Sequence, residues 1–204
     1  RTKVSYPIKF VELSEPGLIC EDKGFRVYTD RLDHRIPSFG FRVVEATHPG
    51  ELLIDKLAKY NIPNGPILGQ LKRGEQVTLA DGTVLNGKDF LGPEKPGRIV
   101  TIIYDTRSTP SIARLAKDAD VLVHESTFAG DESKMARNYY HSTSVQAAKI
   151  AKQENVKKLC LNHISARYMG AKAKKLENQA KKVFPNTVLV NDFDRIEIPM
   201  KGAE

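Results

Sequence analysis

The sequence has no tryptophan and only two cysteines, Cys20 and Cys160, which lie far apart and form no Cys-x-x-Cys pair. This scarcity excludes a disulfide framework. The sequence also lacks a signal peptide and any apolar run of about 18 residues, which excludes a membrane-spanning helix. We therefore expect a cytoplasmic protein in a reducing compartment, without a membrane partner.

Acidic residues are outnumbered by basic ones: 25 Asp and Glu stand against 32 Lys and Arg, giving a formal net charge of +7. This charge permits a polyanionic partner but does not require one. The length of 204 residues and the hydrophobic content of 40% are typical of a globular protein with one sizeable core. The chain begins at Arg1 in what reads as mid-domain sequence, so we expect a fragment or a processed chain.

Strand patterns fill the first part of the chain, and alternating strands and helices fill the last. In residues 1–45, "YPIKFVEL", "GFRVYTD" and "SFGFRVVE" alternate apolar and polar residues between turn residues. A Thr143-x-x-Gln146 capping box opens a later helix. From residue 99 we expect strands over 99–104, 121–123, 159–161, 187–190 and 195–198, and helices over 111–119, 143–153 and 171–183. This order predicts an α/β fold in which helices cover a sheet.

Residues 48–98 have a different composition. Five of the eleven prolines fall there, and Asp81-Gly82 predicts a tight hairpin turn. A short helix is expected over 51–60, where apolar residues follow helical spacing. Because such a segment is poorly suited to a core, we expect a projecting arm or insertion.

Four of the five histidines lie beside other chemically useful groups. Asp105, His124-Glu125 and His163 each follow a predicted strand, and His141 precedes a predicted helix. The carboxyl ends of neighbouring strands meet at one rim of an α/β sheet. Imidazole nitrogens and carboxylate oxygens suit Zn²⁺, and an aspartate can bridge two such ions. The set therefore favours a metal-dependent hydrolase, although each residue taken alone also fits a structural role.

Those structural roles are specific. Asp105 can cap a turn, and His163 can be a satisfied core histidine at the end of a strand. We interpret His48, which precedes Pro49, as a loop residue. The H-x-H-x-D-H signature of two-metal hydrolases is absent from the sequence.

Four segments, in order and spacing, resemble bacterial ribonuclease Z, the endonuclease family that matures tRNA 3′ ends: "YDTRST", "VLVHESTF", "YYHSTSVQAA" and "LNHISARY". In addition, "IPNGPILGQLKRGEQVTLADGTVLNGKDFL" resembles the flexible tRNA-binding exosite of that family. The resemblance covers essentially the whole chain. It implies a metallo-β-lactamase-like αββα sandwich, incomplete at the N-terminus, with 1–204 as one partial domain and 48–98 as the inserted arm.

The resemblance also implies roles for residues. His34 would be a ligand of one zinc, Asp105 would bridge two zinc ions, and His163 would be a ligand of the second. His141 would protonate or stabilise the leaving oxygen, with Glu125 as the residue that orients it. In the family the metals activate a water that attacks the phosphorus following the discriminator nucleotide, which leaves a 3′-hydroxyl on the tRNA.

The implied partners are precursor tRNA and a second copy of the chain in a homodimer. In the arm, Gly65 and Pro66 would bind tRNA. We expect Lys72 and Arg73 near the arm tip, where they would hold backbone phosphates. The basic helix over 171–183 is interpreted equally well as a solvated face or as a phosphate contact.

Two features depart from the family. Tyr104 stands where the family's aspartate usually follows a glycine, and the H-x-H-x-D-H segment is missing. Since a catalytic zinc needs about three protein ligands of its own, we expect this chain to be inactive unless the missing part is supplied. The alternatives are a hydrolase of small phosphodiesters and a catalytically incompetent tRNA-binding module. The arm argues against the first, because a small substrate needs no such structure.

Overall fold

The computed structural model describes residues 5–168 and 170–201. In this part of the chain, seven strands form one sheet in the order β1-β2-β3-β6-β7-β8-β9. The strands β1 to β6 along this order pair antiparallel, and β6 to β9 pair parallel. Their bounds are Gly17–Glu21, Phe25–Leu32, Ser38–Glu45, Ile99–Ile103, Val121–Glu125, Lys158–Asn162 and Thr187–Leu189.

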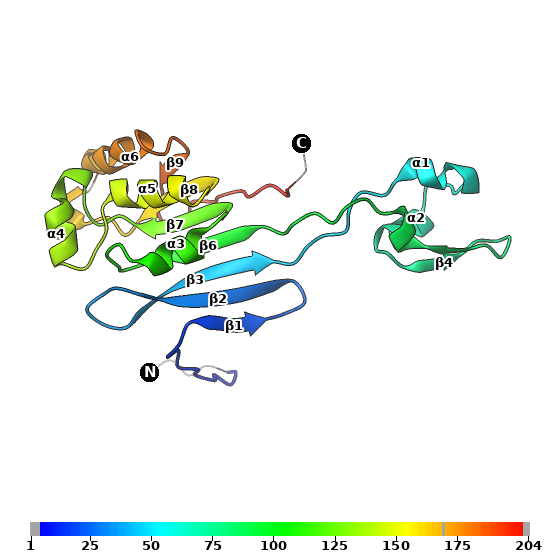
Figure 1. Cartoon of the computed structure of the whole chain (residues 1–204), viewed down its shortest axis with the longest axis horizontal. Coiled ribbons are helices and arrows are strands. Elements are labelled where there is room, and N and C mark those ends of the chain that lie inside the picture. The colour runs from blue at the N-terminus through cyan, green and yellow to red at the C-terminus, as the bar shows by residue number, and fades with distance from the viewer. Residues whose placement is uncertain (1–4, 169, 202–204) are drawn as a thin grey trace.

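Helices pack on one face of this sheet (Figure 1). They are α3 (Pro110–Ala116), α5 (Ser144–Gln153) and α6 (Ala173–Lys181), while α4 (Ser133–Asn138) lies beyond the strand ends. The core between sheet and helices is fully buried, and includes Ile103, Ile112, Leu122, Leu159 and Leu161. The predicted α/β layering and the Thr143–Gln146 capping box are both present.

One glycine is needed for this packing. A Cβ at Gly40 in β3 would lie 2.6 Å from a methyl of Leu115 and 2.7 Å from a methyl of Ile103. Only a residue without a side chain therefore lets α3 approach the strand this closely.

The other face of the sheet carries apolar side chains. Phe41 pairs with Ile102, and Val43 pairs with Val100. Because side chains alternate along a strand, these four point away from the face that holds Thr101 and Ile103. Each of the four remains partly exposed.

The chain between β3 and β6 forms an arm that projects from the sheet (Figure 1). Its elements are α1 (Ile54–Leu57), a 3₁₀ turn (Ala58–Tyr60), α2 (Pro66–Lys72), the hairpin of β4 (Gln76–Thr78) and β5 (Val84–Asn86), and a second 3₁₀ turn (Gly87–Phe90). The hairpin turns at Gly82, whose φ is +85°. This segment has a small core of its own, formed by Leu57, Leu71, Val77, Leu85 and Phe90.

A bidentate ion pair joins the two strands at the root of the arm. Arg98 Nη2 lies 2.6 Å from Glu45 Oε1, and Arg98 Nε donates to Glu45 Oε2 at 2.7 Å. The hydrogen bonds from Arg98 lower the pKa of Glu45 to about 2. Glu45 ends β3 and Arg98 precedes β6, so this pair fixes the place where the arm leaves the sheet.

The Glu45–Arg98 pair predicts a pH-dependent stability. The pKa of Glu45 is lower in the folded protein than its ordinary value of 4.5, so the stabilisation is complete above pH 4.5 and is lost as the pH falls toward 2. Glu45→Gln is expected to lower the free energy of unfolding by about 1–2 kcal/mol at pH 7, a figure reduced for the partial exposure of Arg98. The difference should vanish near pH 2 in urea unfolding.

The matched control for this prediction is Glu15→Gln, because Glu15 is exposed. It should change the free energy of unfolding by less than about 0.5 kcal/mol. A Glu45→Gln deficit that persisted unchanged at low pH would contradict the ion-pair origin.

Three predictions about elements were wrong. The segment 6–13 forms no strand, and 195–198 forms none either; its end passes the amino ends of β7 and β8, where Arg98 Nη1 donates to the carbonyl of Ile198. Neither segment has a neighbour with which to complete a ladder. The helix expected over 51–60 is reduced to Ile54–Leu57 and the following 3₁₀ turn.

Candidate metal and catalytic site

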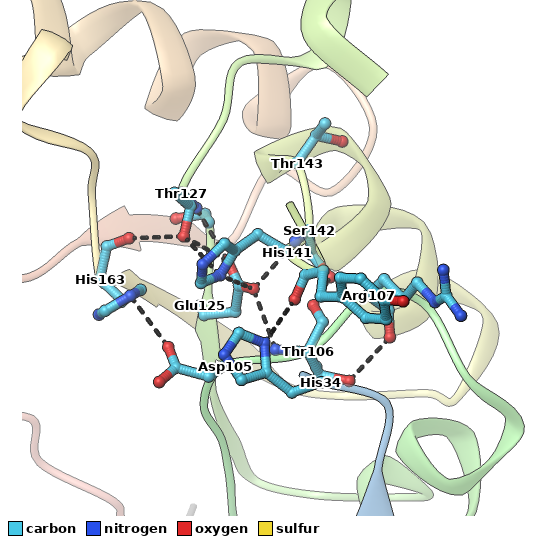
Figure 2. Close-up of polar contacts among 12 residues, drawn as sticks. His34, Asp105, Thr106, Arg107, Glu125, Thr127, His141, Ser142, Thr143 and His163 are labelled. Carbon is cyan, nitrogen blue, oxygen red and sulfur yellow. Dashed lines mark hydrogen bonds and ion pairs between the residues drawn. The ribbon is translucent and has the colours of Figure 1, made fainter. Parts of the chain in front are cut away.

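Asp105, His141 and His163 converge at the carboxyl ends of the strands (Figure 2). Among the described residues, these three form a group whose ligand atoms all lie within 4.8 Å of one another. His163 Nε2 lies 2.9 Å from Asp105 Oδ1. The rings of His141 and His163 are 5.5 Å apart between centroids.

The strand register produces this convergence. Asp105 follows β6, Glu125 ends β7 and His163 follows β8, and these parallel strands are adjacent in the sheet. His163 has a φ of +52°, a left-handed conformation that is uncommon for a residue with a side chain. The backbone therefore changes direction at the point where His163 enters the site.

Glu125 lies beneath this group and is fully buried. Its Oε1 accepts from the backbone N–H of Thr106 at 3.2 Å and of Ser142 at 2.9 Å, and from His141 Nδ1 at 2.9 Å. Its Oε2 accepts from the N–H and the hydroxyl of Thr127 at 2.9 and 2.8 Å. Five donors thus hold one carboxylate and, through it, the orientation of His141.

The charges of Glu125 and His141 support each other. Burial acts to raise the pKa of Glu125, but the hydrogen bonds from His141 and Thr127 outweigh it and hold the pKa below its ordinary value. The hydrogen bond to Glu125 raises the pKa of His141, against the opposing effect of partial burial. The pair therefore favours a protonated imidazole, whose Nε2 remains for a partner outside the pair.

His34 lies next to the group of three. Its ring centroid is 5.1 Å from that of His141, and its Nδ1 donates to the carbonyl of Tyr140 at 2.9 Å. Because a carbonyl only accepts, this bond fixes the tautomer and leaves Nε2 as the nitrogen able to bind a metal.

The donor set fits a divalent metal. Asp105 Oδ1 is a buried atom without a well-directed hydrogen bond, despite its proximity to His163. Two imidazoles and a carboxylate at this spacing are the donor types that zinc uses in proteins.

His124 does not join the site. It is fully buried, and its Nδ1 donates to the carbonyl of Glu125 at 2.6 Å. Burial lowers the pKa of His124, so it is a neutral core histidine.

The arm residues lie away from this group. Gly65 and Pro66 begin α2, with Pro66 at its first position. Lys72 and Arg73 were expected at the arm tip, but they line a hollow of about 510 Å³ with His48 and other residues of the arm root. The reason is that α2 runs back toward the root, because Leu71 must be buried in the core of the arm.

Several residues near His141 were missed by the sequence interpretation. One hollow of about 610 Å³ beside His141 is lined by Arg107, Lys134 and Arg137, with Asp33 as the acidic member. Arg107 pairs with Asp33 at 2.6 Å and lies over the ring of Tyr140. No motif marks these residues, because arginines and lysines are frequent on any basic surface.

Comparison with known proteins links this site to named relatives, although no protein-family model matches the chain. The Ribonuclease Z of Lactobacillus helveticus is 92% identical over 204 residues, which are 100% of this chain and 65% of that protein. The Ribonuclease Z of Lactobacillus acidophilus is 88% identical over the same shares. The chain thus spans less than two thirds of the length of these relatives.

Two solved structures share the fold. The short form of human tRNase Z superposes with a TM-score of 0.55 at 26% identity, covering 91% of this chain and 48% of that one. The metallo-beta-lactamase fold protein YhfI from Bacillus subtilis gives a TM-score of 0.52 at 18% identity, covering 87% and 50%. The predicted metallo-β-lactamase fold is therefore confirmed.

Proposed function

Because this chain belongs to the ribonuclease Z family, we propose that it carries part of the active site of a zinc-dependent endoribonuclease that removes the 3′ trailer from precursor tRNA. The observation that carries the proposal is the convergence of Asp105, His141 and His163 at one rim of the sheet. No helix of the described residues is long and apolar enough to cross a membrane.

Asp105, His163 and the neighbouring His34 are the residues that would hold zinc. Two such ions, when bound, lower the pKa of a water toward about 7 and offset negative charge on the phosphoryl oxygens. Asp105 has the role of the carboxylate shared between them. The described residues offer too few ligands for two ions, so further ligands would come from the remaining part of the family's length.

His141 has the role of the general acid. Cleavage that leaves a 3′-hydroxyl on the tRNA breaks the bond between phosphorus and the 3′ oxygen, and that oxygen must gain a proton. His141 is protonated through its pair with Glu125 and has Nε2 free to donate. A protonated imidazole is not a metal ligand, so the Glu125 pair favours proton transfer over metal binding for this histidine.

The test is a cleavage assay on precursor tRNA with mapped product ends. We would compare the 204-residue chain with the same chain joined to the remaining third of the Lactobacillus helveticus relative. The joined protein is expected to release a trailer with a 5′-phosphate, and the chain alone to be inactive. Cleavage at another position, or products with a 3′-phosphate, would contradict the proposal.

The arm has the role of a tRNA-binding exosite, which a deletion can test. His48 and Lys95 are antiparallel bridge partners at the arm root, so an Asn-Gly turn can join them in place of residues 49–94. In the joined protein, the affinity for precursor tRNA is expected to fall at least about tenfold, since several phosphate contacts are lost. Cleavage of a small phosphodiester should not change.

A matched variant separates shape from charge in the arm. Lys72→Ala with Arg73→Ala keeps the arm core and should reduce the salt dependence of tRNA binding by up to about one unit of slope per lost contact. Equal loss of tRNA and small-substrate cleavage in the deletion would remove the exosite role.

The family also leads us to propose a homodimer that acts on tRNA in the cytoplasm. Light scattering of the joined protein tests the dimer, and a monomer at assay concentration would contradict it.

A further inference from the structure

A hollow of about 340 Å³ opens beside His141 on the side of His34. Its lining combines site residues with two arginines and two aromatic rings: His34, Arg35, Thr127, Phe128, Tyr139, His141, Ser165 and Arg167. None of the arginines or aromatic rings in this lining has a role in the metal or proton chemistry proposed above.

The aromatic residues form a base and a rim. Phe128 is buried, with 5% of its surface exposed, whereas Tyr139 is 51% exposed. Their ring centroids are 6.2 Å apart, with planes inclined by 31°, and Phe128 lies 6.3 Å from His141. Tyr139 therefore presents a ring at the edge of the site, supported from below by a fixed neighbour.

Two arginines accompany the rings. The guanidinium of Arg35 lies 5.6 Å from the centre of the Tyr139 ring and 5.9 Å from that of Tyr140. Arg167 lies 5.6 Å from the Phe128 ring and 3.5 Å from Glu132. Among residues 5–168 and 170–201, no ion pair engages Arg35. An exposed ring beside an unpaired cation attracts a flat, electron-rich group attached to an anion.

An unpaired nucleotide has that chemistry. Bases stack on aromatic side chains, and arginine binds the adjoining phosphate or stacks on the base. We propose that Tyr139 and Arg35 form a stacking subsite for the unpaired nucleobase whose ribose carries the leaving 3′ oxygen. This inference rests on the proposed function, because it takes the RNA substrate and the role of His141 from it.

The position follows from the neighbours of the hollow. His141 would donate its proton to the 3′ oxygen of one nucleotide, and the base of that nucleotide is attached to the same ribose. The hollow borders His141 directly, which puts Tyr139 within reach of that base. Because every base has a π-face, the subsite should bind all four bases with similar affinity.

The test uses a precursor tRNA with 2-aminopurine at the nucleotide before the cleavage site, mixed with the 204-residue chain. Stacking on Tyr139 should quench its fluorescence. Tyr139→Ala should abolish the quenching and weaken binding about five- to a hundredfold, whereas Tyr139→Phe should retain both. Tyr6→Ala, at another exposed tyrosine, should behave like the parent chain.

Each outcome bears on one proposal. Quenching that survives in Tyr139→Ala, or equal retention by Tyr139→Leu and Tyr139→Phe, overturns the stacking subsite while leaving the proposed function intact. A parent chain that binds no precursor tRNA overturns the RNA substrate and the subsite together. Far-ultraviolet circular dichroism and thermal unfolding of each variant show whether a loss reflects misfolding.

Discussion

Asp105→Ala in the joined protein is expected to reduce cleavage of precursor tRNA by at least about 10³-fold, because the bridging carboxylate supports several kcal/mol of charge stabilisation. Asp105 follows β6 at the rim where His141 and His163 converge, and its buried Oδ1 has no well-directed hydrogen bond to lose. The substitution therefore removes a ligand without breaking a structural contact. Asp105→Asn should have a similar effect on activity.

Zinc binding gives a second measurement of the same residue. Titration of the 204-residue chain with Zn²⁺ should detect fewer than two ions per chain, and Asp105→Ala should weaken that binding. Asp22→Asn is the control, because Asp22 is exposed at the turn before β2. Two tightly bound ions in the parent chain would refute the ligand count, and full activity of Asp105→Ala would remove the bridging role.

Glu125→Gln is expected to have the second-largest effect, on both stability and catalysis. An amide cannot accept from all five donors that now converge on the carboxylate, so buried N–H groups lose partners. We expect a loss of about 2–4 kcal/mol in the free energy of unfolding, measured in urea. Cleavage in the joined protein should fall about 10- to 100-fold, as for residues that orient an active group.

The titration of His141 distinguishes orientation from simple destabilisation. Since Glu125 raises the pKa of His141, Glu125→Gln should move that titration to lower pH in NMR spectra of the histidines. Glu177→Gln is the matched control: Glu177 is buried and paired with Lys174 and Lys181, away from the site. It should lower stability without changing His141. An unchanged His141 titration in Glu125→Gln would contradict the pairing.

The sequence predicted the part of the fold in which local and tertiary signals agree. The strands after residue 99 are short apolar runs that are buried in the sheet, and the capping box at Thr143 forms as expected. The strand-end positions of Asp105, Glu125 and His163 followed from that alternation alone. Their convergence was predictable because parallel strands bring their carboxyl ends to one edge.

The remaining features depend on partners that are distant in the sequence. Whether the segment 6–13 becomes a strand depends on a neighbour to pair with, and alternation cannot reveal one. The position of Lys72 depends on burying Leu71 within the arm, a contact that charge patterns do not record. The donors of Glu125 include two backbone N–H groups from Thr106 and Ser142, which no residue type announces.

The arm and the sheet have separate hydrophobic cores, with no residue in common. A protein built from two such cores opens in parts, since each cooperative unit has its own free energy of unfolding. The smaller core of the arm can melt and reform while the strand ends that carry Asp105 and His163 stay in register. The fold thus lets a grip on a large substrate fluctuate without disturbing the geometry of the reacting groups.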